Sequence, residues 1–172
     1  MPDSDGIYGF NEQLGIGKWG ERFLDAFYHE RFIIESVTME QQRQGLDRIY
    51  VGRETGKRFS VEYKTDFTAG RTGNAFIETT SVSATGTKGW AFTSTAQVLL
   101  YFVPPDGTIY ALDMLRIKID AEKLIEEFPL KSAGNKGYET EGVVVSLGVI
   151  CDRYKLWQSL CKRVIPSEMN DD

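Results

Sequence analysis

Hydrophobic positions recur along the chain with two periods, one typical of helices and one typical of strands. Between residues 16 and 30, Phe23, Leu24, Phe27 and Tyr28 follow helical spacing and predict a helix with one apolar stripe. Short runs rich in β-branched and aromatic residues predict strands at 32–37, 45–51, 58–64, 75–82, 98–103, 108–113 and 143–150. The run VLLYFV at 98–103 has no polar position, as expected for a strand buried on both faces.

Polar and glycine-rich segments separate these elements. The two glycines of 52–57 predict a turn that joins its flanking strands into a hairpin. We expect connections at 40–45, 65–74, 83–89, 104–107 and 131–142, and further helices at 90–96, 120–128 and 152–164. This order predicts an α/β fold in which a helix precedes a three-stranded antiparallel meander, which later strands extend into a mixed sheet flanked by helices.

A length of 172 residues suits a single domain. We expect a loose N-terminal arm at 1–14, a core at 16–103, C-terminal strands and helices at 104–165, and a disordered tail at 166–172. The segment GIGKWG at 15–20 matches the G-x-G-x-x-G pattern of dinucleotide-binding turns. No strand precedes it, so we expect these glycines to form a flexible lead into the first helix.

Composition narrows the function classes. The net charge of −5 argues against a protein held on nucleic acid by bulk charge, although the basic residues between 43 and 88 are concentrated enough for a local basic surface. His29 is the only histidine, so triad chemistry has little support. Cys151 and Cys161 are expected to be reduced thiols in the last helix. With no apolar run of about 20 residues and no signal-peptide pattern, we expect a cytoplasmic protein without a membrane partner.

The strand at 58–64 carries an unusual pair of charges. Glu62 and Lys64 are two residues apart and therefore share one face, while Phe59, Val61 and Tyr63 share the other. Asp47 lies on the strand that is expected to pair with this one. Asp47 lies two and four residues before Ile49 and Val51, so in a regular strand it would share a face with these apolar residues. A bulge or burial on both faces is therefore needed there. Two converging carboxylates repel unless a proton or cation lies between them, and Mg²⁺ binds such oxygens.

Gly45, Asp47, Glu62 and Lys64 together resemble the motif of the PD-(D/E)XK nuclease superfamily, whose core is restriction-endonuclease-like and Holliday-junction-resolvase-like. Glu21 lies in the first helix, where that superfamily often carries a further acid. The resemblance spans about 16–103 and implies a Mg²⁺-dependent DNA endonuclease, with Mn²⁺ as a substitute. It implies Asp47, Glu62 and the carbonyl of Tyr63 as metal ligands, Lys64 as the residue that positions water, and Glu21 as a supporting acid. Leu46 stands where the motif often has proline.

Other readings stay open. Glu62 could instead form a cross-strand ion pair with Lys64, Arg48 or Arg58 on an exposed edge, and the scaffold could be a DNA- or protein-binding module without catalysis, or act on RNA. Glu78 and Gln42 are secondary site candidates, each with a solvated position as the alternative. The candidates for DNA-backbone contacts are Arg71, Thr72 and Lys88. Cleavage of both DNA strands would require two sites, which makes a homodimer possible.

Overall fold

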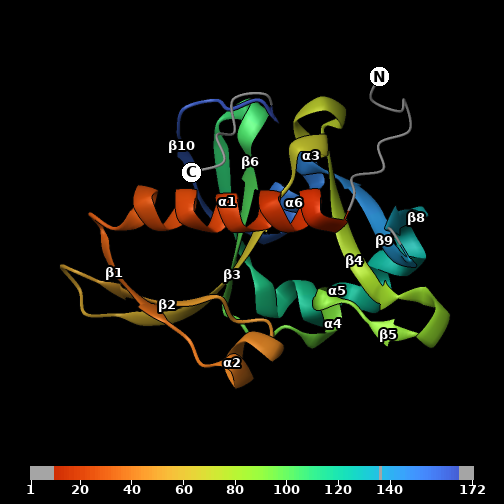
Figure 1. Ribbon diagram of the computed structural model, residues 1–172, viewed down its shortest axis with the longest axis horizontal. Coiled ribbons are helices and arrows are strands. Elements are labelled where there is room, and N and C mark those ends of the chain that lie inside the picture. The colour runs from red at the N-terminus through yellow and green to blue at the C-terminus, as the bar shows by residue number, and fades with distance from the viewer. Residues whose placement is uncertain (1–9, 136, 167–172) are drawn as a thin grey trace.

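The computed structural model describes residues 10–135 and 137–166. Two sheets and the helices around them make up the fold (Figure 1). The helices are α1 (Phe10–Tyr28), α2 (Met39–Arg43), α3 (Phe67–Thr72), α4 (Trp90–Thr93), α5 (Met114–Glu127) and α6 (Leu147–Tyr154), with 3₁₀ turns η1 (Ser83–Thr85) and η2 (Pro104–Asp106). The strands are β1 (Phe32–Ser36), β2 (Arg48–Gly52), β3 (Arg58–Thr65), β4 (Asn74–Val82), β5 (Thr87–Lys88), β6 (Val98–Val103), β7 (Thr108–Asp113), β8 (Leu130–Asn135), β9 (Tyr138–Ser146) and β10 (Lys155–Leu160).

The larger sheet has six strands in the order β1-β2-β3-β6-β7-β10. Its first three strands form the predicted antiparallel meander, and β3 then pairs with β6 in parallel. The other pairings are antiparallel, so the sheet is mixed, as predicted. A second sheet has the order β5-β4-β9-β8. The α/β class and the mixed, helix-flanked sheet are thereby confirmed, while the second sheet was not predicted.

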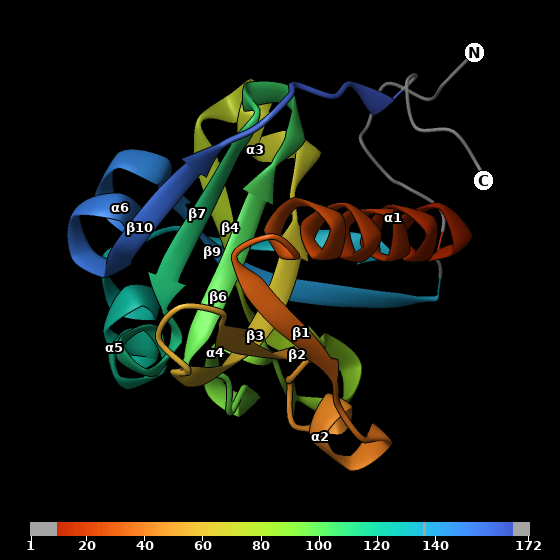
Figure 2. The same cartoon turned by 90° about the vertical axis from the view of Figure 1, so that its left-hand side faces the viewer.

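Two apolar clusters cover the two faces of the six-stranded sheet. On one face, Leu24 and Tyr28 of α1 are fully buried against Val61, Leu100 and their neighbours. On the other face, β4, β9, α5 and α6 pack against the alternate positions of β6 and β7. Figure 2 shows α1 on one side of the sheet, with α5 and α6 on the opposite side. All six residues of β6 are buried, which confirms the prediction from its uninterrupted apolar run.

Helix α1 begins earlier than predicted and includes the GIGKWG segment. Residues 10–14 belong to the helix rather than to a loose arm, and the glycines lie inside it instead of leading into it. Gly20 has a packing role, because a β-carbon there would lie 1.9 Å from Oγ1 of Thr65 on β3. The absence of a side chain therefore lets α1 lie close against β3. The expected arm at 1–9 and tail at 167–172 fall outside the described residues.

Several segments that were predicted to be loops contain short regular elements. In 40–45, α2 forms because Thr38 and Gln41 make a reciprocal capping box. In 65–74, α3 begins at the Asp66 cap, whose Oδ1 accepts from the N–H of Ala69. The 131–142 segment forms most of a β8–β9 hairpin, and α5 begins at Met114 rather than at residue 120. Capping residues explain the unpredicted helical segments, since Thr38, Asp66 and Asp113 cap α2, α3 and α5.

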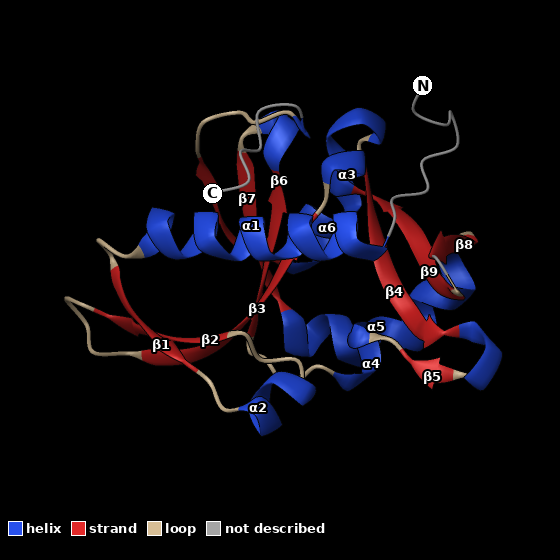
Figure 3. Cartoon of the chain, viewed as in Figure 1, coloured by secondary structure: helices blue, strands red, loops and turns tan. Residues whose placement is uncertain are grey.

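The two C-terminal predictions are correct only at the start of each segment. The expected strand at 143–150 ends at Ser146, which caps α6, and the expected helix at 152–164 is replaced after Tyr154 by β10. Trp157 fits both periods, but pairing with the free edge of β7 satisfies the backbone groups of 155–160 that face β7. Figure 2 shows β10 beside β7, and Figure 3 marks β7 as a strand of the same sheet. Cys151 and Cys161 are free thiols, and only Cys151 lies in a helix.

Among the described residues, no helix combines the length and apolar character needed to cross a membrane.

Gly20→Ala should destabilise the fold, because the added methyl group would overlap Thr65. We expect a loss of about 1–3 kcal/mol in the free energy of unfolding, measured by urea titration. Gly17→Ala is the matched control in the same helix, since nothing lies within 4 Å of a β-carbon there. It should stabilise the protein by up to about 1 kcal/mol. Equal effects of the two substitutions would contradict the close packing of α1 on β3.

Candidate active site

Glu62 and Lys64 lie on the face of β3 that points away from α1. The Nζ atom of Lys64 is 3.0 Å from Oε1 of Glu62. Glu62 is only 4% exposed, and its Oε2 atom is buried without a hydrogen-bond partner among the described residues. Because β3 lies between β2 and β6, Glu62 is not on an exposed edge. The alternative of an ion pair on an exposed edge is therefore wrong, because Glu62 is buried within the sheet. Arg58 pairs with Glu35 rather than with Glu62.

The second sheet and α4 complete the surroundings of Lys64. Its Nζ atom lies 5.7 Å from the ring centre of Trp90, and the backbone N–H of Trp90 donates to Oε1 of Glu78 at 3.4 Å. Burial lowers the pKa of Lys64, but nearby carboxylates raise it by more, so the ammonium form is favoured. These carboxylates belong to Glu62, Glu78 and Asp47. Burial and the charge of Glu62 raise the pKa of Glu78.

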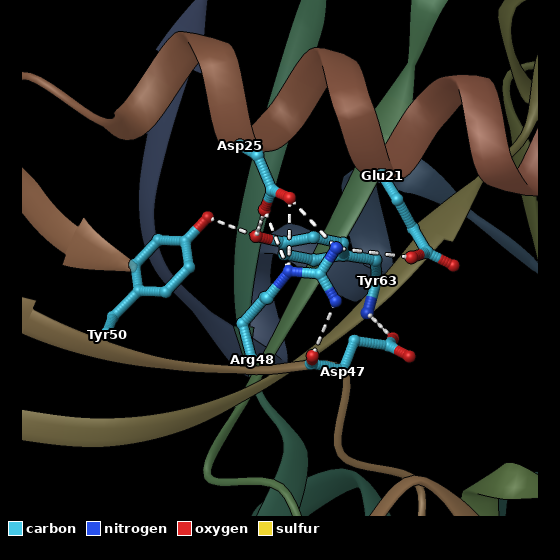
Figure 4. Close-up of polar contacts among 6 residues, drawn as sticks. All are labelled: Glu21, Asp25, Asp47, Arg48, Tyr50 and Tyr63. Carbon is cyan, nitrogen blue, oxygen red and sulfur yellow. Dashed lines mark hydrogen bonds and ion pairs between the residues drawn. The ribbon is translucent and has the colours of Figure 1, made fainter. Parts of the chain in front are cut away.

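Asp47 lies just before β2, at a break in the ladder with β3. The register pairs Arg48 with Val61, yet the N–H of Asp47 also donates to the Val61 carbonyl at 2.9 Å. Two consecutive residues therefore lie opposite Val61, as in a β-bulge, which agrees with the irregularity expected from parity. Two residues further along β3, the Tyr63 N–H donates to Oδ2 of Asp47 at 2.7 Å (Figure 4). The carboxylate thus takes the place of a strand carbonyl at the edge of the ladder.

A left-handed turn positions this break. Gly45 has a φ of +78°, and a β-carbon there would lie 3.0 Å from the Cα of Ser94. The Ser94 hydroxyl donates to the Gly45 carbonyl at 3.3 Å, and the Thr95 N–H donates to the carbonyl of Gln44 at 2.9 Å. The segment before Asp47 is therefore fixed against the loop that leads into β6.

Acids on α1 approach Asp47 from the other face of the sheet. Figure 4 shows Glu21 and Asp25 extending from the helix toward Arg48. Arg48 contacts Asp25 through Nε and Nη2, the latter at 2.8 Å, and its Nη1 donates to the Asp47 carbonyl at 2.7 Å. Burial, followed by the charge of Asp47, raises the pKa of Glu21. Ionisation of Glu21 therefore destabilises the folded protein as the pH rises through the carboxyl pKa of the unfolded chain, and a bound cation would relieve this cost.

Two tyrosines on the sheet face that packs against α1 support Asp25. The hydroxyl of Tyr63 donates to Oδ1 of Asp25 at 2.8 Å, and the hydroxyls of Tyr50 and Tyr63 are 2.6 Å apart. Burial is the main cause that raises the pKa of each tyrosine, so both remain protonated donors. The side chain of Tyr63 thus contacts Asp25 of α1, while its backbone N–H faces Asp47.

The charges around Asp47 and Glu62 fit a hard divalent cation. Five carboxylates and two cationic side chains leave a formal charge of −3 when all are ionised; they are Glu21, Asp25, Asp47, Glu62, Glu78, Arg48 and Lys64. Within a strand residue the N–H and C=O point to the same side, so the carbonyl of Tyr63 points toward the edge where its N–H meets Asp47. No three acid, cysteine or histidine side chains of the described residues would enclose a metal by themselves. Mg²⁺ requires no such cage, since it retains several waters.

The remaining predicted residues lie on other elements of the fold. Gln42 is exposed on α2. Arg71 and Thr72 are exposed in the last turn of α3, just before β4, whereas Lys88 lies on β5 and pairs with Thr80 near the end of β4. About 20 Å of strand separates these two positions, given the rise of a β-strand. The structure therefore does not bring the three candidate DNA contacts into one patch.

The sequence analysis overlooked Asp25 and considered Arg48 only as part of the basic stretch and as a partner for Glu62. A signal for both was available. Glu21 and Asp25 are four residues apart and must share a face of the helix. Arg48 shares parity with the core residue Tyr50, so it must point toward the face that the first helix covers.

Tyr63→Phe should lower the free energy of unfolding by about 1–3 kcal/mol, because Asp25 loses a donor and the buried Tyr50 hydroxyl loses its partner. Chemical denaturation measures this loss. Since the two hydroxyls share one hydrogen bond, Tyr50→Phe combined with Tyr63→Phe should cost less than the sum of the single substitutions. Strictly additive losses would show that the two hydroxyls act independently.

Comparison of this chain with protein-family models, curated proteins and solved structures finds no match. The arrangement of the residues themselves is therefore the basis for a functional assignment.

Proposed function

We propose that this protein is a Mg²⁺-dependent DNA endonuclease whose site consists of Asp47, Glu62, the carbonyl of Tyr63, and Lys64. One observation carries the proposal. Glu62 is buried with one oxygen paired to Lys64 and the other unpartnered, in a region with excess negative charge. An ionised carboxylate oxygen without a donor is costly to bury, and a divalent cation would satisfy it.

Each residue has a role that follows from its surroundings. Asp47 and Glu62 would hold the cation together with the backbone of Tyr63. The Lys64 ammonium, fixed by Glu62 and the face of Trp90, would orient a water or donate to a phosphate oxygen. When bound, the cation would lower the pKa of a coordinated water and offset the charge of the phosphate. Glu21 would support the cation from α1, and Glu78 would hold Lys64 from the second sheet.

The order of elements supports the resemblance to the PD-(D/E)XK superfamily and a restriction-endonuclease-like core. Helix α1 precedes the meander, Asp47 lies just before β2, and Glu62 and Lys64 lie on β3, which β6 then joins in parallel. This likeness is part of the proposal, together with DNA as the substrate. Arg71, Thr72 and Lys88 are proposed backbone contacts and Gln42 a further polar contact. A homodimer would supply the second site that cleavage of both strands requires.

The competing proposal is a binding module that holds DNA or a protein without cleaving anything. The surroundings of Glu62 favour the enzyme, because burial of an acid with an unpartnered oxygen has no evident benefit for binding alone. Incubation of supercoiled, branched and linear DNA with the protein and Mg²⁺ separates the two functions, and parallel RNA substrates test the nucleic acid specificity. DNA binding without any cleavage would favour the binding module.

Lys64→Ala should reduce Mg²⁺-dependent nicking of supercoiled DNA by on the order of 10²- to 10³-fold, because the developing charge loses a fixed ammonium donor. The rate of conversion from supercoiled to open-circular plasmid measures this effect. Lys123→Ala is the matched control, since Lys123 lies on α5 and pairs, among the described residues, with Glu127 alone. Unchanged nicking by Lys64→Ala would rule out the assigned role of Lys64.

Mn²⁺ should stabilise the wild-type protein but not Asp47→Asn. At about 100 times the Kd, bound cation adds about 2.7 kcal/mol of stability, or roughly 5–10 °C in Tm. Asparagine retains an acceptor for the Tyr63 N–H and removes a charge beside Glu21, so the metal-free variant should remain folded. Differential scanning calorimetry with and without Mn²⁺ checks both expectations. An equal Tm shift in both proteins would place the cation elsewhere.

A further inference from the structure

The two acids that α1 presents to Arg48 are held very differently. Asp25 accepts hydrogen bonds from Arg48 Nε, which lies 3.1 Å from each carboxylate oxygen, and from Nη2 at 2.8 Å. The Tyr63 hydroxyl also donates to Asp25 at 2.8 Å. Glu21 has a single contact with Arg48, from Nη2 to Oε2 at 3.4 Å. Arg48 and Asp25 thus form a bidentate, charge-assisted pair, whereas the Arg48–Glu21 distance is long for a charge-assisted hydrogen bond.

Arg48 itself has little freedom to follow Glu21. Its side chain is 18% exposed, and its third nitrogen, Nη1, donates to the carbonyl of Asp47 at 2.7 Å. The guanidinium is planar, so these bonds to Asp25 and Asp47 fix its position. A change in the Glu21 contact must therefore come from movement of Glu21.

Glu21 is the acid that can move toward a cation at Asp47. Its side chain is 37% exposed, and the charge of Asp47 acts on it directly. Asp25 has no comparable freedom, since Arg48 and Tyr63 occupy both of its oxygens. Glu62 lies on the face of the sheet opposite to Glu21. Its unpartnered, buried oxygen independently indicates that a positive ligand is needed on that face.

We propose that Arg48 divides the acids of α1 into a fixed structural anion, Asp25, and a releasable one, Glu21, which turns from Arg48 to the cation when the site is loaded. In the metal-free protein Arg48 is thus an internal competitor for Glu21 and limits the affinity of the site for divalent cations. This inference rests on the proposed cation site at Asp47 and Glu62, and it adds a means by which the protein sets the occupancy of that site.

A crystal structure of the wild-type protein with Mn²⁺ tests the inference directly, with the ion located by its anomalous signal. We expect Glu21 to have left Arg48 and to contact the ion or one of its waters, while Asp25 keeps its contacts with Arg48 and Tyr63. An ion at Asp47 and Glu62 with Glu21 still on Arg48, or with Asp25 turned toward the ion, would overturn the inference alone. The absence of an ion at Asp47 and Glu62 would overturn the proposed function as well.

Glu21→Gln and Asp25→Asn form a matched pair, since each removes one negative charge from the same helix face. We expect Glu21→Gln to weaken Mn²⁺ binding by about 10-fold or more in a calorimetric titration, with little change in the Tm of the metal-free protein. We expect Asp25→Asn to lower that Tm by roughly 4 °C or more and to change the Mn²⁺ affinity by less than about 3-fold. Equal losses of Mn²⁺ affinity would overturn the division of roles. If Asp25→Asn does not fold, the wild-type crystal structure still decides between the two outcomes.

Discussion

The hydrogen bond from the Tyr63 N–H to the Asp47 carboxylate is the contact on which the arrangement of the site depends. A strand carbonyl would ordinarily occupy this position and continue the β2–β3 ladder. Because a charged side chain accepts the bond instead, the ladder ends and an acid is held at the edge between the two faces of the sheet. Glu21 can then approach from the α1 side, while Lys64 acts on Asp47 from the opposite side.

This arrangement places mutually repelling groups together, and the rest of the fold offsets the cost. The aromatic side chains of α1 pack on Phe102 and its neighbours, with Phe23 only 4.7 Å from Phe102 between ring centres. Gly20 brings the helix against Thr65, and the Arg48 guanidinium neutralises Asp25 at the same interface. A rigid apolar interface can hold acids at separations that they would avoid in water, as is typical of functional sites.

The sequence predicted the features that follow from periodicity. The apolar stripe of the first helix, the meander, the doubly buried β6 and the shared face of Glu62 and Lys64 all follow from spacings of 3.6 or 2 residues. Where both the helical and the strand period fit the same residues, pairing with a distant strand determined the structure, as it did for Trp157 in β10. The second sheet and the contact of Trp90 with Lys64 depend on segments that meet only in three dimensions. Metal binding, DNA cleavage and dimer formation remain predictions.

The central position of β3 has a consequence for the order in which the protein assembles during synthesis. β3 pairs in parallel with β6, and 32 residues separate the end of one from the start of the other. Until β6 emerges, β3 has an open edge, and neither Trp90 nor Glu78 can be held beside Lys64 by a completed sheet. Contacts between distant segments form late because the chain must first close the intervening loop. A nascent chain would therefore lack a formed site until most of its core had been made.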